Sequence, residues 1–573
     1  NGDAPILYVR DREGRITHVQ DGVGLHECAY DADGRLDRVS LPQCPATDLI
    51  YEYDRIGRRR RMAVVDSDNR ARHWVGYGFD SAGRMASVSN DVLAASYAYA
   101  SDGVSIAATE MGSPGGTVLR AQRTYDGLNG LVGLENAVDG ALVSTFGYRH
   151  DTAGRRVGRS QADGSAWTYE YDALGQVAAA RKRFADGIRV GGAQFEYAYD
   201  SIGNRSRARN WTGPDTPWQS YAANELNQYT SIDTPGRTVV TGQAEADATV
   251  HVGTRSQRAL LANRHGQYYW HVNPVDNASG PAWVTNVVSA SGEQDGDLHI
   301  QTETRPALVP PASGRLEYDA DGNLIRDGLY EYRWDAENRL VRIESLPSVP
   351  APARVRVDNT YDYLGRRIRK TVSGGYANGT YTTTGTTTYV WNDFNIIAGI
   401  SDAGYTNWYT RGLDLSGTPQ GAGGIGGALS MTRETGEVTN TYLYCFDGNG
   451  NVVNLVDASD GNVAATYAYG PFGKLLRSTG EAAESNPVRW STKPMDAEVG
   501  LVMYETRPYS PVAGRFLCRD PLEEFGGMNL YGFVGNDPVD GIDPLGMEGL
   551  EGTGPLYRIA NQVTVPLRIP LGF

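Results

Sequence analysis

Apolar and polar residues alternate in short runs along most of the chain, and a polar turn ends each run. Tyr51-Glu-Tyr53 places two rings on one face of an extended segment, and Met85-Ala-Ser-Val88 resumes the alternation after such a turn. A period of two residues is typical of β-strands that bury one face. The pattern therefore predicts an all-β protein with many short antiparallel strands and very little helix.

Between the runs, an aspartate is followed three residues later by a glycine, as in Asp54-Arg-Ile-Gly57. The aspartate of such a turn accepts a backbone N–H through its carboxylate, and the glycine tolerates a positive φ. Each unit is thus predicted to be a hairpin turn in a repeat protein, with tyrosine ladders rather than a compact apolar core holding the repeats together. Inside a tyrosine-flanked segment the spacing occurs ten times, starting at Asp11, Asp31, Asp54, Asp80, Asp151, Asp172, Asp200, Asp319, Asp362 and Asp447.

The repeat stops between about Asp233 and Ala312, where shorter alternating runs such as Ala248-Thr-Val-His-Val252 take its place. Several short strands at close spacing predict a small β-sandwich, with a weak likeness to immunoglobulin-like modules. An insertion of this kind is tolerated when its two ends lie close together. Further along, the Thr- and Gly-rich run from Gly374 to Thr388 predicts a long hairpin.

Composition narrows the function classes. The 573 residues carry a net charge of −15 and a pI of about 5.1, which argues against nucleic acid as the main partner. The sequence has no apolar run of about 18 residues, so we expect no membrane span. The chain opens at Asn1 without a charged and then apolar leader, and we expect it to be a fragment of a longer protein. The four cysteines lack CxxC spacing, although a Cys28–Cys44 disulfide remains open.

The sequence predicts no cofactor and no metal site. His251, His265 and His271 lie in the insertion without the regular spacing of ligands. The Gly-rich segment 412–431 has no Walker lysine after it, so it is predicted to be a loop. Asp447-Gly-Asn-Gly-Asn451 lacks the alternating acidic residues of a calcium loop and is better explained as a repeat turn.

The C-terminal part changes character and carries an ordered series of motifs. Its members are Asp496-Ala-Glu-Val-Gly500, Arg507-Pro-Tyr509, Gly514-Arg515-Phe516, Asp520-Pro521, Asn536-Asp-Pro538 and Asp543-Pro544-Leu-Gly546. This segment resembles the Rhs-repeat-associated core, and the Tyr-Asp turns resemble the YD repeats of the same family. The family includes toxin-complex C components, polymorphic Rhs toxins and bacterial teneurin-like proteins.

The resemblance implies a fold and a division into segments. The strands of such proteins wind as an antiparallel spiral sheet into a hollow shell, a β-cocoon, and the C-terminal core forms a plug inside one end. The expected segments are the repeat shell over 1–232 and 313–411, the inserted β-sandwich over 233–312, the associated core over 412–547, and the start of a tail or effector linker over 548–573.

The resemblance also implies a chemistry. In many family members the core is an aspartic autoprotease, and the matching motifs make Asp520, Asp543 and Arg515 its candidate catalytic residues. The cut would fall between Met547 and Glu548, although family members commonly have leucine before the cut. From the residues alone, two carboxylates that share a site can act as acid and base beside an arginine. The alternative is that these Asp-Pro motifs only form turns and that Arg515 packs on tyrosine rings.

Two functions are therefore expected. The first is a shell that encapsulates, cuts free and helps to deliver its own C-terminal effector, a toxin. The second is a bacterial surface scaffold that binds a glycan or a partner protein. In both cases the expected location is secreted or on the cell surface, and the expected partners are the effector segment and a delivery or surface protein.

Overall fold

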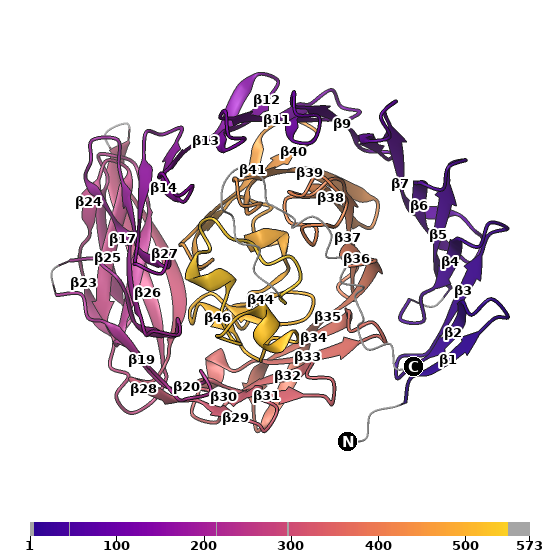
Figure 1. The fold of residues 1–573 in the computed structure, drawn as a ribbon. Helices are drawn as coiled ribbons and strands as arrows, with labels where there is room; N and C mark the ends of the chain where they lie inside the picture. The colour runs from indigo at the N-terminus through magenta and orange to yellow at the C-terminus, as the bar shows by residue number, and fades with distance from the viewer. Residues whose placement is uncertain (1–4, 45, 214, 295–296, 548–573) are drawn as a thin grey trace.

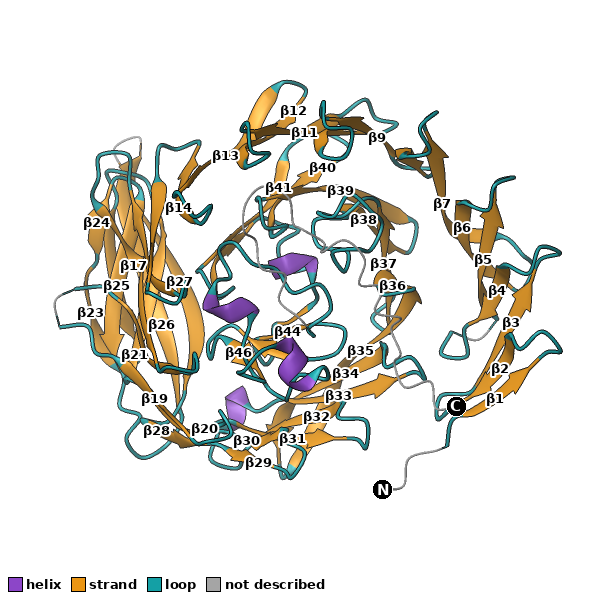
Figure 2. Ribbon diagram, in the orientation of Figure 1, coloured by secondary structure: helices purple, strands orange, loops and turns teal. Residues whose placement is uncertain are grey.

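The computed structural model describes residues 5–547 except 45, 214, 295 and 296. Within these residues the protein consists of strands and loops, apart from four short 3-10 turns, η1 (Ala351–Ala353), η2 (Trp490–Thr492), η3 (Glu523–Gly526) and η4 (Val534–Asn536) (Figure 2). The expected all-β fold is confirmed. Figure 1 shows the strands winding as a spiral whose second turn lies partly inside the first.

The first turn of the spiral is a 21-stranded sheet in which each strand pairs antiparallel with the next along the chain. Its strands are β1 (Leu7–Arg10), β2 (Ile16–Gln20), β3 (Leu25–Tyr30), β4 (Leu36–Ser40), β5 (Thr47–Tyr53), β6 (Arg59–Asp66), β7 (Ala71–Phe79), β8 (Met85–Ser89), β9 (Ala94–Tyr99), β10 (Ile106–Gly112), β11 (Val118–Tyr125), β12 (Leu131–Val138), β13 (Ala141–His150), β14 (Arg156–Gln161), β15 (Ala166–Tyr171), β16 (Val177–Arg183), β17 (Arg189–Tyr199), β18 (Arg205–Asn210), β19 (Gln219–Ala223), β20 (Tyr229–Asp233) and β28 (Ser313–Arg315).

The second turn is a 14-stranded sheet with the same antiparallel order. Its strands are β29 (Glu317–Tyr318), β30 (Leu324–Arg326), β31 (Tyr330–Trp334), β32 (Leu340–Ser345), β33 (Arg356–Tyr361), β34 (Arg367–Ala377), β35 (Thr380–Asn392), β36 (Asn395–Ser401), β37 (Tyr405–Arg411), β38 (Ala428–Thr435), β39 (Val438–Phe446), β40 (Val452–Asp457), β41 (Val463–Tyr469) and β42 (Leu475–Thr479). The hairpin of β34 and β35 confirms the one predicted from the Thr- and Gly-rich run.

The repeat turns have the predicted geometry and one additional contact. In the Asp54 turn the Gly57 N–H donates to the Asp54 carbonyl at 3.1 Å, with a Gly57 φ of +87°. Asp54 Oδ1 accepts the Ile56 and Arg58 backbone N–H groups at 3.0 and 2.9 Å, and Oδ2 accepts Arg58 Nε at 2.7 Å. The residue after the glycine therefore completes the turn, and it is Arg, Gln or Asn at the corresponding positions Arg15, Arg35, Arg84, Arg155, Gln176, Asn204, Asn323 and Arg366.

The same arginines join neighbouring repeats. Arg35 lies over the Tyr53 ring with its guanidinium carbon 4.8 Å from the ring centre, and Arg58 lies 4.1 Å from that of Phe79. Tyr53 in turn donates its hydroxyl to the Leu36 carbonyl at 2.8 Å. Each such contact is worth about 0.5–1 kcal/mol at an exposed site. In these repeats the ring before a turn is thus contacted by the arginine of the preceding repeat.

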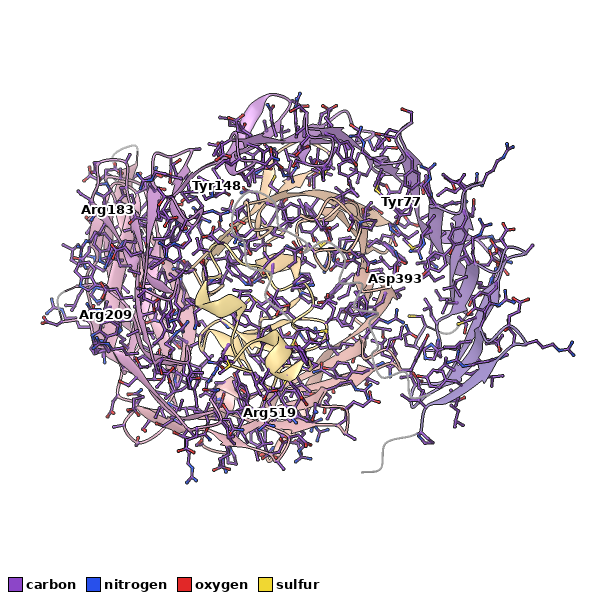
Figure 3. All side chains as sticks on the ribbon, viewed as in Figure 1. Tyr77, Tyr148, Arg183, Arg209, Asp393 and Arg519 are labelled. Carbon is purple, nitrogen blue, oxygen red and sulfur yellow. The ribbon has the colours of Figure 1, made fainter. Side chains whose placement is uncertain are left out.

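The expectation that tyrosine ladders replace an apolar core is wrong. Buried side chains of the first turn, such as Met62 and Val75, pack against Ile397 and Leu443 of the second turn in one large apolar cluster. The two turns of the spiral therefore form a double wall with a conventional core between them. Figure 3 shows side chains filling this space, and Tyr148 of the first turn accepts the Gly448 N–H of the second at 2.6 Å.

The C-terminal plug, defined here as residues 480–547, lies inside the spiral (Figure 1). Its small antiparallel sheet consists of β43 (Met495–Asp496), β44 (Leu501–Met503), β45 (Pro508–Ser510) and β46 (Arg515–Phe516). Its rings of Tyr509, Phe516 and Phe533 contact one another within a second apolar cluster that includes strands of the second turn. Both walls thus surround the plug.

All four cysteines, Cys28 and Cys44 included, are free thiols.

Residues 234–312 form an insertion whose strands make two small sheets separate from the spiral. One contains β21 (Arg237–Gln243), β24 (Asn263–His265) and β25 (Tyr268–Pro274), and the other contains β22 (Thr249–Thr254), β23 (Gln257–Leu261), β26 (Ala282–Gln294) and β27 (Asp297–Val309). The first sheet touches the wall, where Tyr268 donates its hydroxyl to the Gly191 carbonyl at 2.7 Å and His265 stacks on Phe184. Strand β20, which precedes the insertion, pairs directly with β28, which follows it.

Removing residues 234–312 should leave the spiral folded. Asp233 and Ser313 are direct antiparallel partners, so an Asn-Gly turn can join them without moving either strand. We expect a lower unfolding temperature, because the wall loses the Tyr268 and His265 contacts, but an unchanged pattern of limited proteolysis elsewhere. New cleavage throughout β1–β20 would show instead that the insertion is integral to the wall. The wild-type protein, digested in parallel, is the control.

Candidate functional site

Two predicted aspartates meet in the plug. Asp520 follows β46 and its backbone N–H donates to the Leu530 carbonyl at 2.8 Å, while Asp543 lies in the last described loop. Both are buried, with 6% and 1% of the residue surface exposed. The fold thus brings together two carboxyl groups that are 23 residues apart in the sequence, a separation that follows from their numbers.

The cation between them is Arg507, which directly precedes β45. Its Nη2 atom lies 2.7 Å from Asp520 Oδ2 and 3.6 Å from Asp543 Oδ2. The guanidinium also donates through Nη1 to the Leu530 carbonyl at 3.1 Å and stacks 3.7 Å from the centre of the Phe516 ring. Arg507 is among the largest side chains with less than 2% exposure, so both ion pairs are shielded from water.

The Asp543 carboxylate accepts hydrogen bonds from the backbone of the last described residues. Its Oδ1 atom accepts backbone N–H groups from Leu545 at 3.2 Å, Gly546 at 2.7 Å and Met547 at 3.1 Å. The Gly546 carbonyl in turn accepts Arg507 Nε and the Thr506 hydroxyl. Gly546 and Met547, the last two residues before the predicted cut, are therefore held by Asp543, and Gly546 is held by Arg507 as well.

A glycine leaves room between Asp520 and the predicted cut. A Cβ atom at Gly526 would lie 2.6 Å from Asp520 Oδ2 and 2.9 Å from the Met547 carbonyl oxygen. No side chain can occupy that position without displacing one of them. Because Gly526 has no side chain, Asp520 and the Met547 carbonyl face the same small space.

The two carboxyl groups differ in their surroundings. Burial raises the pKa of Asp543 to about 6, although Arg507 and the N–H groups of Gly546 and Met547 act in the opposite direction. Asp520 adds to the rise as a nearby like charge. A carboxyl group with this pKa can hold a proton in mildly acidic solution beside a second carboxyl paired with arginine. This is the arrangement that general acid–base catalysis requires.

Lys493 donates hydrogen bonds to the loop that carries Asp543. Lys493 Nζ donates to the Pro544 carbonyl at 2.8 Å and to the Gly423 carbonyl at 2.7 Å, and it pairs with Glu505 at 2.7 Å. The side chain is 2% exposed. The Gly-rich segment 412–431, predicted to be a loop, thus contributes a backbone acceptor behind the site rather than a phosphate cradle.

Arg515, the arginine expected from the resemblance, lies elsewhere in the plug. Its guanidinium carbon is 3.8 Å from the centre of the Tyr229 ring, and its Nη2 donates to Asn204 and Asn529 at 3.0 and 3.1 Å. It therefore fastens the plug to the first turn of the wall. Met547 lies at the site, and Glu548, on the other side of the predicted cut, is outside the described residues.

Sequence reasoning missed Arg507 as a site residue, although it stands in the same ordered series of motifs. No signal in the sequence favoured Arg507, since Glu505 and Thr506, two polar residues, directly precede it and separate it from the apolar run Leu501–Met503. Gly526 carried no signal either.

Comparison with known proteins agrees with the repeat. The model of the family described as RHS Repeat matches residues 150–189, which contain the Asp151 and Asp172 turns. The chain therefore contains an RHS repeat at these residues. Over 236 residues it is 28% identical to the tRNA3(Ser)-specific nuclease WapA of Bacillus spizizenii, covering 40% of this chain and 9% of that protein.

A second relative matches a larger part of this chain. Over 469 residues this chain is 23% identical to toxin subunit YenC1 of Yersinia entomophaga, and the match covers 74% of this chain and 46% of that protein. Among solved structures, the crystal structure of TcdB2-TccC3-Cdc42 aligns with a TM-score of 0.42 and 16% identity, over 96% of this chain and 28% of that one. The RHS-repeat protein spans less than half of the length of each of these relatives.

The described residues contain neither a helix that could span a membrane nor a cluster of metal-ligating side chains. No helix within them is long and apolar enough to cross a membrane. Among the same residues, no group of three or more His, Cys, Asp or Glu side chains is arranged to hold a metal ion.

Proposed function

We propose that this RHS-repeat protein is a toxin shell that holds a C-terminal effector and cuts the chain between Met547 and Glu548. The observation that carries the proposal is the buried Asp520–Arg507–Asp543 group with the Met547 carbonyl beside it. The named relatives, a nuclease and a toxin subunit, support an effector at the C-terminal side. We further propose secretion or display on a bacterial surface as its location.

The proposed reaction is hydrolysis of one peptide bond. Asp520 accepts a proton from a water molecule, whose oxygen attacks the Met547 carbonyl carbon. Asp543, which holds its proton because it is buried, donates it to the leaving nitrogen of Glu548. The carbon–nitrogen bond breaks, and the products are the Met547 carboxylate and a new amino group on Glu548. Arg507 offsets the negative charge that the two carboxyl groups would otherwise concentrate.

The position of the site supports retention of the effector. Met547 belongs to the plug, and the plug lies within both turns of the spiral (Figure 1). A chain that continues from Met547 therefore starts inside the walls, and a cut there frees its end without opening them. The winding of the sheet also pairs nearly every strand on both sides, which leaves few edges to aggregate.

The rate of cutting should fall as the pH rises above about 6. Because the proposed acid must hold its proton, the rate constant is expected to fall by about tenfold per pH unit once the pH exceeds about 6. The measurement is intact mass against time after the full chain refolds from denaturant at pH 5 to 8. Size exclusion in native buffer should show the released segment travelling with the shell.

Two results would count against this proposal in different ways. An intact mass at every pH would remove the autoprotease and leave the shell. A cut after Met547 whose fragment separates at once from the shell would leave the protease and remove encapsulation.

A further inference from the structure

A small cavity lies where three parts of the protein meet. It has a volume of about 30 Å³ and lies between β14–β15 of the first turn, residues 447–471 of the second turn, and the plug. Its lining includes Arg159, Trp167, Asp447, Trp490 and Val539. A space of about 10–15 Å³ on this measure holds one water molecule, so the cavity accommodates a small ion or one to two waters.

Two N–H donors of the lining have no partner in the described part of the chain. Trp490 Nε1 and Arg159 Nε are both shielded from solvent and make no hydrogen bond there. Trp490 is 5% exposed as a residue, and its ring belongs to the plug. A buried donor without an acceptor costs about 1–3 kcal/mol, which makes an unassigned acceptor in this cavity favourable.

The acceptors of the lining are already engaged. Asp447 Oδ2 accepts Arg159 Nη1 at 3.1 Å, and Asp447 Oδ1 accepts the Asn449 and Asn451 backbone N–H groups at 3.0 and 3.1 Å. Asn451 Oδ1 accepts the Ser491 N–H at 2.8 Å. Apart from the Tyr169 hydroxyl, which can donate or accept, the groups left to a guest on these described lining residues are N–H donors, so a water molecule would find few acceptors for its two hydrogens.

We propose that this cavity binds a halide ion, chloride under ordinary conditions. Asp447 pairs with Arg159 at 3.1 Å, and Asp540 lies 4.0 Å from Arg156 Nε, so the charges around the cavity are close to balanced. A halide suits the remaining N–H groups because it accepts hydrogen bonds without needing to donate any. The net charge of −15 on the whole chain does not oppose this strongly, because charges beyond about 10 Å are screened at 0.1 M salt. A bound ion would tie Trp490 of the plug to Arg159 of the wall.

The proposal is tested by exchanging the anion at constant ionic strength. Replacing sodium gluconate, whose anion is too large for the cavity, by sodium chloride or bromide should raise the unfolding temperature of the full chain in a saturable way. Crystals grown in bromide should show an anomalous peak between Arg159 and Trp490. In Trp490→Phe, which keeps an aromatic ring of smaller size and loses the N–H donor, the halide affinity from the same titration should fall about tenfold or more.

The matched control is Trp408→Phe. Trp408 Nε1 is also buried and has no hydrogen-bond partner among the described residues, but Trp408 stacks on His73 and does not line the cavity, so its removal should leave the halide response unchanged. If Trp490→Phe fails to fold, Asp447→Asn provides a second test, because loss of the opposing charge should tighten halide binding. Equal unfolding temperatures in gluconate and chloride, or no bromide peak in the cavity, would overturn the proposal and assign the space to water.

Discussion

Asp520→Asn and Asp543→Asn should each leave the Met547–Glu548 bond whole. An asparagine amide retains the shape of the carboxyl group but cannot exchange its proton, so the cutting rate should fall by about 100-fold to 10,000-fold. At position 543 the amide oxygen can still accept the N–H groups of Gly546 and Met547, so the loop should keep its conformation. Intact mass after refolding measures the cut, and the unfolding temperature shows that the protein remains folded.

Substitutions of Arg507 and Arg515 test which arginine takes part in cutting, since the structure points to Arg507 and the resemblance to Arg515. Arg507→Lys keeps a positive charge but loses the fork that reaches Asp520, Asp543 and Leu530 together, so cutting should slow strongly. Arg515→Lys removes contacts with Tyr229 and Asn204, which fasten plug to wall, so it should lower the unfolding temperature without a comparable loss of cutting. The reverse outcome would return the catalytic assignment to Arg515.

Local features of the fold were predictable because they depend on neighbouring residues. Asp54 and Gly57 specify a turn through bonds within five residues, and the run from Gly374 to Thr388 specifies a hairpin through strand propensity. The arginine after each glycine was visible in the sequence, but its place over the next tyrosine was not. That contact depends on the distance between successive strands, which a single turn does not encode.

The core between the walls was not predictable in the same way. Alternation shows that Met62 and Val75 share one face of a sheet, but not that Leu443 packs against them from the next turn of the spiral. The strands that meet are more than 300 residues apart in sequence, as the Tyr51 to Asn392 hydrogen bond illustrates. Such contacts follow from the winding of the whole sheet.

The candidate site shows the same division. Asp520 and Asp543 could be named because the resemblance matches their Asp-Pro motifs to those of the family, and the structure places both beside one guanidinium. The resemblance matched Arg515 and not Arg507. The position of Arg507 beside the carboxyl groups depends on how the plug folds, since the three residues are far apart in the sequence.

Asp496→Asn should detach the plug from the wall. Asp496 of β43 is 1% exposed and pairs with two cations of β34, Arg367 at 2.6 Å and Lys370 at 3.0 Å. Burial by itself would raise the pKa of Asp496, but the charges of Arg367 and Lys370 outweigh it and lower the pKa to about 2. Loss of the carboxylate leaves two buried cations facing each other, at a cost of about 3–5 kcal/mol.

The control for this change is Glu498→Gln, because Glu498 is one-third exposed and pairs only with Lys370 among these groups. Its cost should stay within about 1 kcal/mol. The pKa of Asp496 is lowered on folding, so its contribution is present above the unfolded value near 3.8 and is lost as the pH falls toward about 2. Urea unfolding at pH 7 and pH 3 measures both effects. If Asp496→Asn unfolds within about 0.5 kcal/mol of wild type at pH 7, the ion pairs do not hold the plug, and its retention must come from the aromatic cluster around Tyr509.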